Sequence, residues 1–431
     1  MKASSFERHR AILRIALPAI ITNITTPILG LVDTAMAGRL GSPSYIGAIA
    51  IGAALFNMIY WLMNFLRAGT SGQTAQAIGA DDKSAADDIL FRGIFIGFLA
   101  GIFIIILSPL IAYIFIPFME ADAPTSALAE DYFRTVIWGA PAYLSSYAVS
   151  GWLLGNQNSL STLRIAVVTN VLNIAISLSL VLGFGMKLKG IALGTAISQW
   201  VAFFYGLFIV YRRYNPRLKG FQKVFEGREL KYFFKLNFDI FLRTLCLVGV
   251  TMWFTRAGAS MGSGILAANS ILMQLFLLFS FFMDGFAYAG EAIAGKELGA
   301  GRLHAIKSLE KDLLCWGLVL SLFGVTVYFF AGDLIFALLT DSSEVINIAA
   351  DYKIWAVTIP LFGFMAFIYD GIYIGMTLTR LMLATMLAAI GVFFLVYFSL
   401  CSLWGNHALW LAFSLYLLTR GIGQWLIFRK K

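Results

Sequence analysis

The 431-residue chain carries little charge: Asp, Glu, Lys and Arg make up only 13% of it, while 60% of its residues are hydrophobic. A soluble globular domain carries about 25% charged residues. The low charge therefore excludes a soluble domain and indicates a protein that crosses a membrane several times. The net charge of +9 does not indicate nucleic-acid binding, because the basic residues flank hydrophobic runs and do not form one surface.

Cysteine and histidine are also scarce, with three of each in the sequence. Cys246, Cys315 and Cys401 lie in apolar segments and form no CxxC pair, so we interpret them as small packing residues. The sequence offers no metal-ligand constellation and no cluster of paired acids, which argues against an enzyme. The segment 262–270 lacks the lysine of a phosphate-binding loop, so we expect no ATP site and no cofactor. Any active transport would then depend on an ion gradient.

Long apolar runs dominate what is present. A helix needs about 20 apolar residues to cross the hydrocarbon core of a bilayer. We therefore predict an all-α polytopic membrane protein with twelve transmembrane helices, at approximately 13–37, 45–66, 93–117, 132–154, 163–185, 190–211, 232–255, 264–289, 312–331, 346–375, 381–402 and 407–428. The first run is too long for a signal peptide and has no evident cleavage site, so we expect it to be retained.

Loop charges test this topology independently. With the N-terminus placed in the cytoplasm, most of the 32 Lys and Arg fall on the inner side, and the outer loops hold only Arg39, Lys187, Lys189 and Arg256. The positive-inside rule thus supports twelve spans with both termini in the cytoplasm. We expect a multi-pass protein of the inner (plasma) membrane.

The chain repeats itself at an offset of 220 residues. The matching pairs are Gly79-Ala80 with Gly299-Ala300, Asp131-Tyr132 with Asp351-Tyr352, and Gly151 and Gly155 with Gly371 and Gly375. Six spans in each repeat place both halves in the membrane in the same orientation, as in transporters whose substrate cavity lies between two lobes. We predict two pseudo-symmetric six-helix lobes, with an N-lobe over 1–211, a cytoplasmic linker over 212–235 and a C-lobe over 236–431.

Asp33 is the single charged residue in the apolar run 15–37. A charged side chain at membrane depth costs roughly 2.5–3.5 kcal/mol, so such a residue is a candidate functional site. A carboxylate there can bind Na⁺ as a hard oxygen ligand, or take up a proton once it is removed from water. The position 220 residues later is Trp253, which suggests a task specific to the first half; drift between the halves and a purely packing role are the alternatives.

Segments along nearly the whole chain resemble a known family. The segments LVDTAMAGRLG (31–41), AQAIGADDK (75–83), TNVLNIAISLSLVLGFGMKLKGIALGTAIS (169–198) and AGKELGAGR (294–302) resemble the multidrug and toxic compound extrusion (MATE) family. The segments NFDIFLRTL (237–245), MDGFAYAGEAIAG (283–295) and DGIYIGMTLTR (370–380) are similar to its branch named for DNA-damage-inducible protein F (DinF). The order, spacing and number of these motifs make the match specific. The resemblance implies a V-shaped pair of lobes that exports bulky cationic or amphipathic compounds in exchange for H⁺ or Na⁺.

The resemblance also implies the coupling residues. It places the first-helix acid at Asp33 and a kink-forming proline at Pro18, and a bend of this helix is then the element that the ion would bias. In some relatives the fifth helix has an Asn followed four residues later by an Asp; here Asn173 matches and Ser177 replaces the acid. A single carboxylate in the pocket favours H⁺ over Na⁺, and Na⁺ bound at Asp33 and Asn173 is the alternative.

Further polar residues complete the prediction. Thr195 and Ser198 fit small hydroxyl positions of the family pocket, or else bond back to their own helix. Candidate substrate-binding residues are the acids and methionines Asp370, Asp284, Glu291, Met36, Met63 and Met252. Asp370 is the deepest of the three acids, and Glu291 could instead be solvated near the cytoplasmic end of its span. Asp239 and Arg243 are four residues apart, and we interpret them as an ion pair within one helix.

The sequence thus predicts a secondary active multidrug antiporter that works by alternating access, is a monomer in the bilayer and binds small cationic or amphipathic compounds. The alternative is a flippase for lipid-linked oligosaccharides or other amphiphilic lipids. Such proteins often carry several cationic residues in the cavity, and spans one to six contain almost none, which argues against it.

Overall fold

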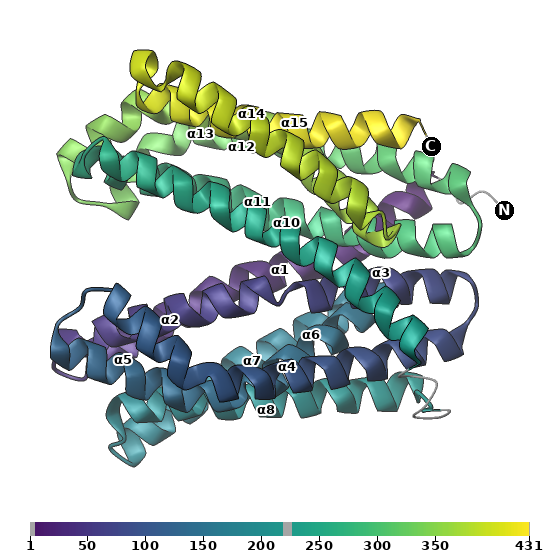
Figure 1. Ribbon diagram of the computed structural model, residues 1–431, viewed down its shortest axis with the longest axis horizontal. Coiled ribbons are helices and arrows are strands. Elements are labelled where there is room, and N and C mark those ends of the chain that lie inside the picture. Colours follow the sequence, from purple (N-terminus) through teal and green to yellow (C-terminus); the bar gives the residue numbers. More distant parts are fainter. Residues whose placement is uncertain (1–4, 219–225, 431) are drawn as a thin grey trace. The chain divides into compact units, whose positions relative to one another are not determined.

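The computed structural model describes residues 5–218 and 226–430, and every regular element in these ranges is a helix (Figure 1). The predicted all-α class is therefore confirmed. The elements are α1 Ser5–Gly38, α2 Pro43–Leu62, α3 Phe65–Gly79, α4 Lys83–Phe118, α5 Ala123–Val136, η1 Ile137–Gly139, α6 Ala140–Gly155, α7 Ser159–Leu178, η2 Ser179–Gly183, α8 Lys187–Tyr214, α10 Gly227–Ser260, α11 Ser263–Gly299, α12 Leu303–Leu339, α13 Ser343–Gly375, α14 Thr379–Trp404 and α15 Asn406–Arg429.

Eleven helical stretches of the described chain are long and apolar enough to cross a membrane, with α2 and α3 counted as one. The predicted span 132–154 is the one that does not meet these criteria, because it is divided among α5, the 3-10 turn η1 and α6. Pro141 lies in the first turn of α6, where its missing N–H is tolerated; placed in the middle of one long helix it would remove a hydrogen bond. The protein is a multi-pass membrane protein.

The helices form two compact units. The first unit is Ile21–Asn237, and the second is Phe238–Lys431 together with the chain up to Ile20. The predicted lobes, 1–211 and 236–431, differ from these units chiefly in the first twenty residues. Within the predicted linker 212–235, residues 219–225 lie outside the described chain, and residues 227–235 are already part of α10.

Specific contacts explain why the start of α1 belongs to the second unit. Arg8 Nε donates to Asp312 Oδ2 of α12 at 2.6 Å, and Trp316 Nε1 donates to His9 Nδ1 at 3.1 Å. Further along α1, Gly285 of α11 leaves room for the Ile20 side chain and the Ala16 carbonyl, which would lie 2.4 and 2.8 Å from a Cβ at that position. The unit boundary therefore falls two residues beyond Pro18, within one continuous helix.

The 220-residue repeat is visible in how helices approach each other. A Cβ on Gly151 of α6 would lie 2.3 Å from the carbonyl oxygen of Arg67 in α3, and a Cβ on Gly371 of α13 would lie 2.0 Å from that of Ala287 in α11. Arg67 and Ala287 are themselves 220 residues apart. The next glycines repeat the arrangement, with Gly155 against Ser71 and Gly375 against Glu291. The repeated glycines thus permit the same close helix contact in both units.

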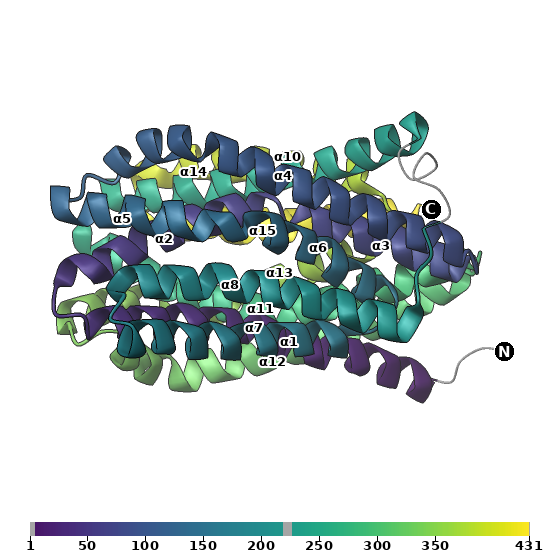
Figure 2. The ribbon, with the colours of Figure 1, turned by 90° about the horizontal axis from the view of Figure 1, so that it is seen from below.

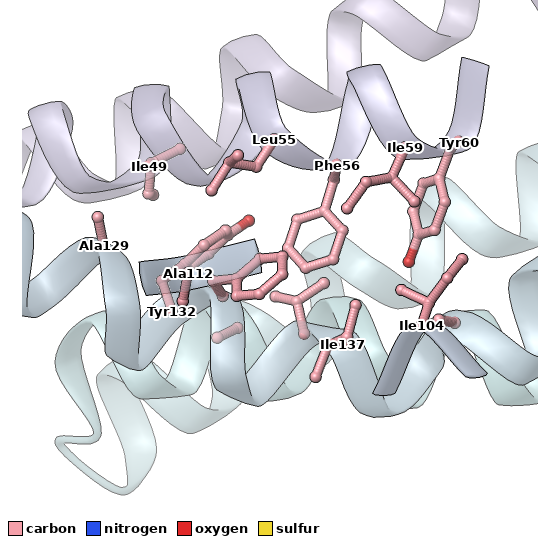
Figure 3. Packing of buried hydrophobic residues seen from close by; sticks show 14 of the residues in the cluster. Ile49, Leu55, Phe56, Ile59, Tyr60, Ile104, Ala112, Ala129, Tyr132 and Ile137 are labelled. Carbon is pink, nitrogen blue, oxygen red and sulfur yellow. The ribbon is translucent and has the colours of Figure 1, made fainter. Parts of the chain in front are cut away.

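Aromatic packing forms the core of the first unit, where α2 meets α5. Figure 3 shows Leu55 and Phe56 of α2 directed toward Tyr132 and Ile137. The ring centroids of Phe56 and Phe133 are 5.1 Å apart, which suits attractive aromatic contact. This core fixes the position of Tyr132, whose side chain is important to the site described next.

Candidate functional site

Asp33 lies in the second half of α1 and is buried, with 7% of its surface exposed. Met36 and Ala37, which share its helix face by i, i+3 and i, i+4 spacing, are buried as well. Among the described residues, no donor bonds to Asp33 Oδ1. A buried acceptor without a donor costs about 1–3 kcal/mol, so a proton or a cation at this oxygen would be stabilising.

Tyr132 of α5 is the neighbour that connects this acid to the rest of the unit. Its phenol lies within electrostatic reach of the Asp33 carboxylate and also approaches the Thr195 hydroxyl of α8. The ring is buried in the α2–α5 core, where Gly52 leaves space for it: a Cβ on Gly52 would lie 2.3 Å from Tyr132 Cδ1. Core packing therefore fixes the Tyr132 ring in the neighbourhood of both Asp33 and Thr195.

The helices α7 and α8 run side by side and supply the remaining polar groups (Figure 2). Asn173 Nδ2 donates to Thr195 Oγ1 at 3.0 Å, and Thr195 Oγ1 donates to the Ile191 carbonyl at 3.1 Å. Among the described residues, no donor reaches the buried oxygen Asn173 Oδ1. Asn173 Oδ1 is thus, like Asp33 Oδ1, a buried acceptor without a donor in the described chain.

Other predicted residues support this arrangement. Ser177 Oγ approaches the Ile191 carbonyl at 3.4 Å, and Gly194 makes room for it, since a Cβ there would lie 2.1 Å from Ser177 Oγ. Ser198 bonds back to the Thr195 carbonyl at 2.8 Å, which is the own-helix alternative considered above. Asn170 Nδ2 donates to the Thr25 carbonyl at 3.3 Å and so joins α7 to α1. The structure therefore brings Asn173, Ser177 and Thr195 together at the α7–α8 contact, whereas Ser198 bonds within its own helix.

The set combines one carboxylate with several neutral oxygens. Asp33 is the carboxylate of the set, and the other oxygens belong to neutral amide, phenol and hydroxyl groups. No group of three or more His, Cys, Asp or Glu that could hold a metal ion occurs in the described parts of the chain. A proton needs a single oxygen, whereas a bound cation needs several oxygens around it. The two acceptors without donors, Asp33 Oδ1 and Asn173 Oδ1, are the oxygens that would contribute to a Na⁺ site.

Asp370 of α13 lies in a different cluster in the second unit. Arg243 of α10 and Arg420 of α15 both donate to its Oδ2, the latter at 2.5 Å, and Gln424 Nε2 donates to its Oδ1 at 2.8 Å. The predicted ion pair of Asp239 with Arg243 is therefore wrong. The reason is a tertiary contact: the Arg243 guanidinium pairs with the Asp370 carboxylate of α13 and not with Asp239 of its own helix.

The displaced partner, Asp239, accepts a hydrogen bond from Thr379 Oγ1 at 3.0 Å instead. The other substrate-binding candidates are dispersed. Glu291 is only 1% exposed, so the idea that it is solvated near a helix end is wrong, and Asp284 is half-buried on the same helix. The methionines differ from one another, with Met36 buried in the α2–α5 core, Met63 packed against that core and Met252 exposed on α10. Their roles in substrate binding stay predictions.

Sequence reasoning missed Tyr132, Arg420 and Gln424 as site residues. Arg420 lies inside the predicted span 407–428, so the rule that singled out Asp33 would have found it as well. Tyr132 belongs to the repeated Asp-Tyr pair, but that repeat gives no information about what its hydroxyl faces.

A helical membrane fold built from an internal repeat, with a buried acid in one unit, is the arrangement of a secondary transporter. The MatE family model matches residues 18–179 and 240–398, which is more than half of the chain. The chain therefore belongs to the MATE family of transporters.

Individual relatives agree with this assignment. The chain is 36% identical over 429 residues to DNA damage-inducible protein F of Escherichia coli, which covers 98% of this chain and 92% of the relative. It is 22% identical over 362 residues to the probable multidrug resistance protein NorM of Oceanobacillus iheyensis, over 81% and 80% of the two chains. The fold matches the outward-facing structure of a multidrug resistance MATE family transporter of the MOP superfamily with a TM-score of 0.85, at 20% identity and over 98% and 95% of the two chains.

Proposed function

We propose that this protein is a secondary active antiporter that exports bulky amphipathic compounds, including cationic drugs, in exchange for H⁺ by alternating access. The proton binds at Asp33 and removes the charge from the buried pocket of the first unit. Family membership and the names of the multidrug resistance relatives support the efflux activity.

The observation that carries the proposal is the state of Asp33: a buried carboxylate with an oxygen that lacks a donor among the described residues. When a group binds a proton more tightly in one conformation of the protein than in the other, protonation favours that conformation. The shift in the equilibrium is set by the difference between the two proton affinities. Pro18 precedes Asp33 in the same helix and lies close to the boundary between the units. We therefore infer that protonation of Asp33 changes the bend of α1 near Pro18.

The cellular setting follows from the charges of the sequence. We place the protein in the inner membrane as a monomer with both termini in the cytoplasm, since the basic residues concentrate on the loops of that side. No nucleic-acid partner is expected.

Transport by purified protein in liposomes tests this function. An outwardly directed H⁺ gradient, with the liposome lumen acidic, should drive uptake of a fluorescent cationic drug, while an outwardly directed Na⁺ gradient of the same size should not. The variant Asp33→Asn should lose this uptake because its side chain cannot exchange a proton, and Asp131→Asn, which changes an exposed acid of α5, should retain it. Full H⁺-driven uptake by Asp33→Asn would refute the coupling role, and uptake driven by Na⁺ alone would refute the choice of ion.

A further inference from the structure

The cluster around Asp370 in the second unit has more positive than negative charge. Arg243 and Arg420 both bond to Oδ2 of the same carboxylate, and Gln424, which is neutral, bonds to Oδ1. Two guanidinium groups therefore share one carboxylate. The pair of arginines carries one positive charge that Asp370 does not neutralise.

Among the described residues, no second acid forms an ion pair with either guanidinium group. Tyr416 lies beside Arg420, with the guanidinium carbon 5.5 Å from the ring centroid, but the phenol is neutral. Cys246 lies near Arg243 on α10 and is likewise uncharged as a thiol. The closest acid along α10 is Asp239, one turn before Arg243, and it bonds to Thr379.

The arginines also have more donors than the cluster has acceptors. In the described parts of the chain, the buried Nε atoms of Arg243 and Arg420 have no hydrogen-bond acceptor. A guanidinium presents several N–H donors in a fixed planar fork that matches the two oxygens of a carboxylate. The site lacks acceptor oxygens and negative charge, and a second carboxylate would supply both.

Arg243 is the more exposed member of the pair. Its side chain is 14% exposed, whereas that of Arg420 is 4% exposed. Arg420 and Asp370 form the buried base of the cluster, and Arg243 forms its accessible edge.

We propose that Arg243 and Arg420 form a binding site for the carboxylate head group of an amphipathic solute, with Asp370 and Gln424 orienting the two guanidinium groups. The inference rests on the proposed export of amphipathic compounds and extends the range of substrates to organic anions. In this proposal Asp370 does not bind a cationic substrate, because its negative charge is already paired with the two arginines.

A pair of matched probes tests the site in equilibrium binding, without any transport step. The protein in phosphatidylcholine nanodiscs is titrated with 11-(dansylamino)undecanoic acid and with its uncharged methyl ester, and dansyl fluorescence is recorded. The wild type should bind the acid more tightly than the ester. Arg243→Gln should weaken binding of the acid by roughly ten- to a hundred-fold, as expected for loss of a charged hydrogen bond, and leave the ester unchanged. Lys235→Gln, an exposed lysine on the same helix, is the control and should bind both probes as the wild type does.

Asp370→Asn gives the sharpest result because it removes the negative charge but keeps the shape. It should bind the acid more tightly than the wild type does, with little change for the ester, which also reports whether the variant has kept its fold. Equal affinity of the wild type for acid and ester would overturn the proposal, and so would weaker acid binding by Asp370→Asn while that variant still binds the ester.

A last arm separates a solute from a lipid. Nanodiscs that contain phosphatidylglycerol offer an anionic phosphate head group at high local concentration. A solute site should keep its affinity for the acid in these nanodiscs, and displacement of the probe by phosphatidylglycerol would overturn its assignment to a solute. Because the assay measures binding alone, its result is independent of whether H⁺ drives transport.

Discussion

At the scale of single residues, the first unit places a neutral phenol near both a buried acid and a helix–helix contact. Tyr132 lies within electrostatic reach of Asp33 and near Thr195, and Thr195 is bonded to Asn173. A phenol can donate to a charged carboxylate and can accept from a protonated one. A Tyr132 hydroxyl that bonds to Asp33 in one protonation state would therefore exchange its role as donor or acceptor in the other.

Tyr132→Phe tests this role directly. The substitution keeps the ring in the α2–α5 core but removes the hydroxyl, and loss of a hydrogen bond worth about 0.5–1.5 kcal/mol should slow H⁺-driven drug uptake by up to roughly ten-fold. The thermal unfolding midpoint should stay close to that of the wild type. Tyr113→Phe, at an exposed position of α4, is the control. Uptake by Tyr132→Phe at the wild-type rate would show that the hydroxyl has no part in coupling.

The sequence singled out Asp33 but not its neighbour Tyr132, for a physical reason. A carboxylate in an apolar run is unusual whatever surrounds it, whereas Tyr132 is one of 17 tyrosines and becomes distinctive only through what it faces. The same limit explains the error at Arg243. Its spacing from Asp239 was correct for an ion pair, and only the packing of α13 on the other helices provides the competing carboxylate.

At the scale of helices, glycines set how closely the repeated pairs approach. In the second unit, α13 packs on α11 through Gly371, where a Cβ would lie 2.0 Å from the Ala287 carbonyl oxygen and 2.6 Å from its carbon. Backbone atoms cannot rotate away as a side chain can. A methyl group here would force the two helices apart.

Gly371→Ala should therefore lower the thermal unfolding midpoint of the purified protein by several degrees, since overpacking of this kind costs about 1–3 kcal/mol. Gly391→Ala is a matched control in the interior of α14, where no atom lies within 4 Å of the added Cβ. That variant should be unchanged or slightly more stable, because alanine favours the helix over glycine. Equal midpoints for the two variants would contradict the proposed role of the contact.

Hydropathy predicted the helices well and their interruptions less well. Long apolar runs identify a span whatever its tertiary contacts, so the predicted segments coincide with helices of the structure. The break at Ile137–Gly139 depends on local backbone geometry near Pro141, which a hydropathy window does not register. The 220-residue repeat, in contrast, could be recognised in the sequence, because the same close helix contact requires glycines at equivalent positions in both halves.

At the scale of the whole molecule, the loop charges predict an orientation in the membrane. Fusion of green fluorescent protein to the C-terminus should give fluorescent cells, and fusion of alkaline phosphatase there should give no activity, because this end is expected in the cytoplasm. Alkaline phosphatase inserted between Met186 and Lys187, in a predicted outer loop, should be active. An active enzyme at the C-terminus would reverse the topology and with it the direction of proposed transport.

The grouping of the first twenty residues with the second unit is the part of the whole molecule that the sequence does not predict. A repeat predicts two equal halves of the chain, but the packing of Arg8 and His9 against α12 assigns the first residues to the second unit. Such contacts join residues about three hundred positions apart, and no pattern within one span records them.

The continuity of α1 across the unit boundary has a thermodynamic consequence. Residues before Ile20 share their environment with α11 and α12, while Asp33 shares its own with α5, and both belong to one hydrogen-bonded backbone. Linkage between two binding events is reciprocal in free energy. If a solute moves the first turns of α1 and thereby changes the proton affinity of Asp33, protonation of Asp33 changes the affinity for the solute by the same factor.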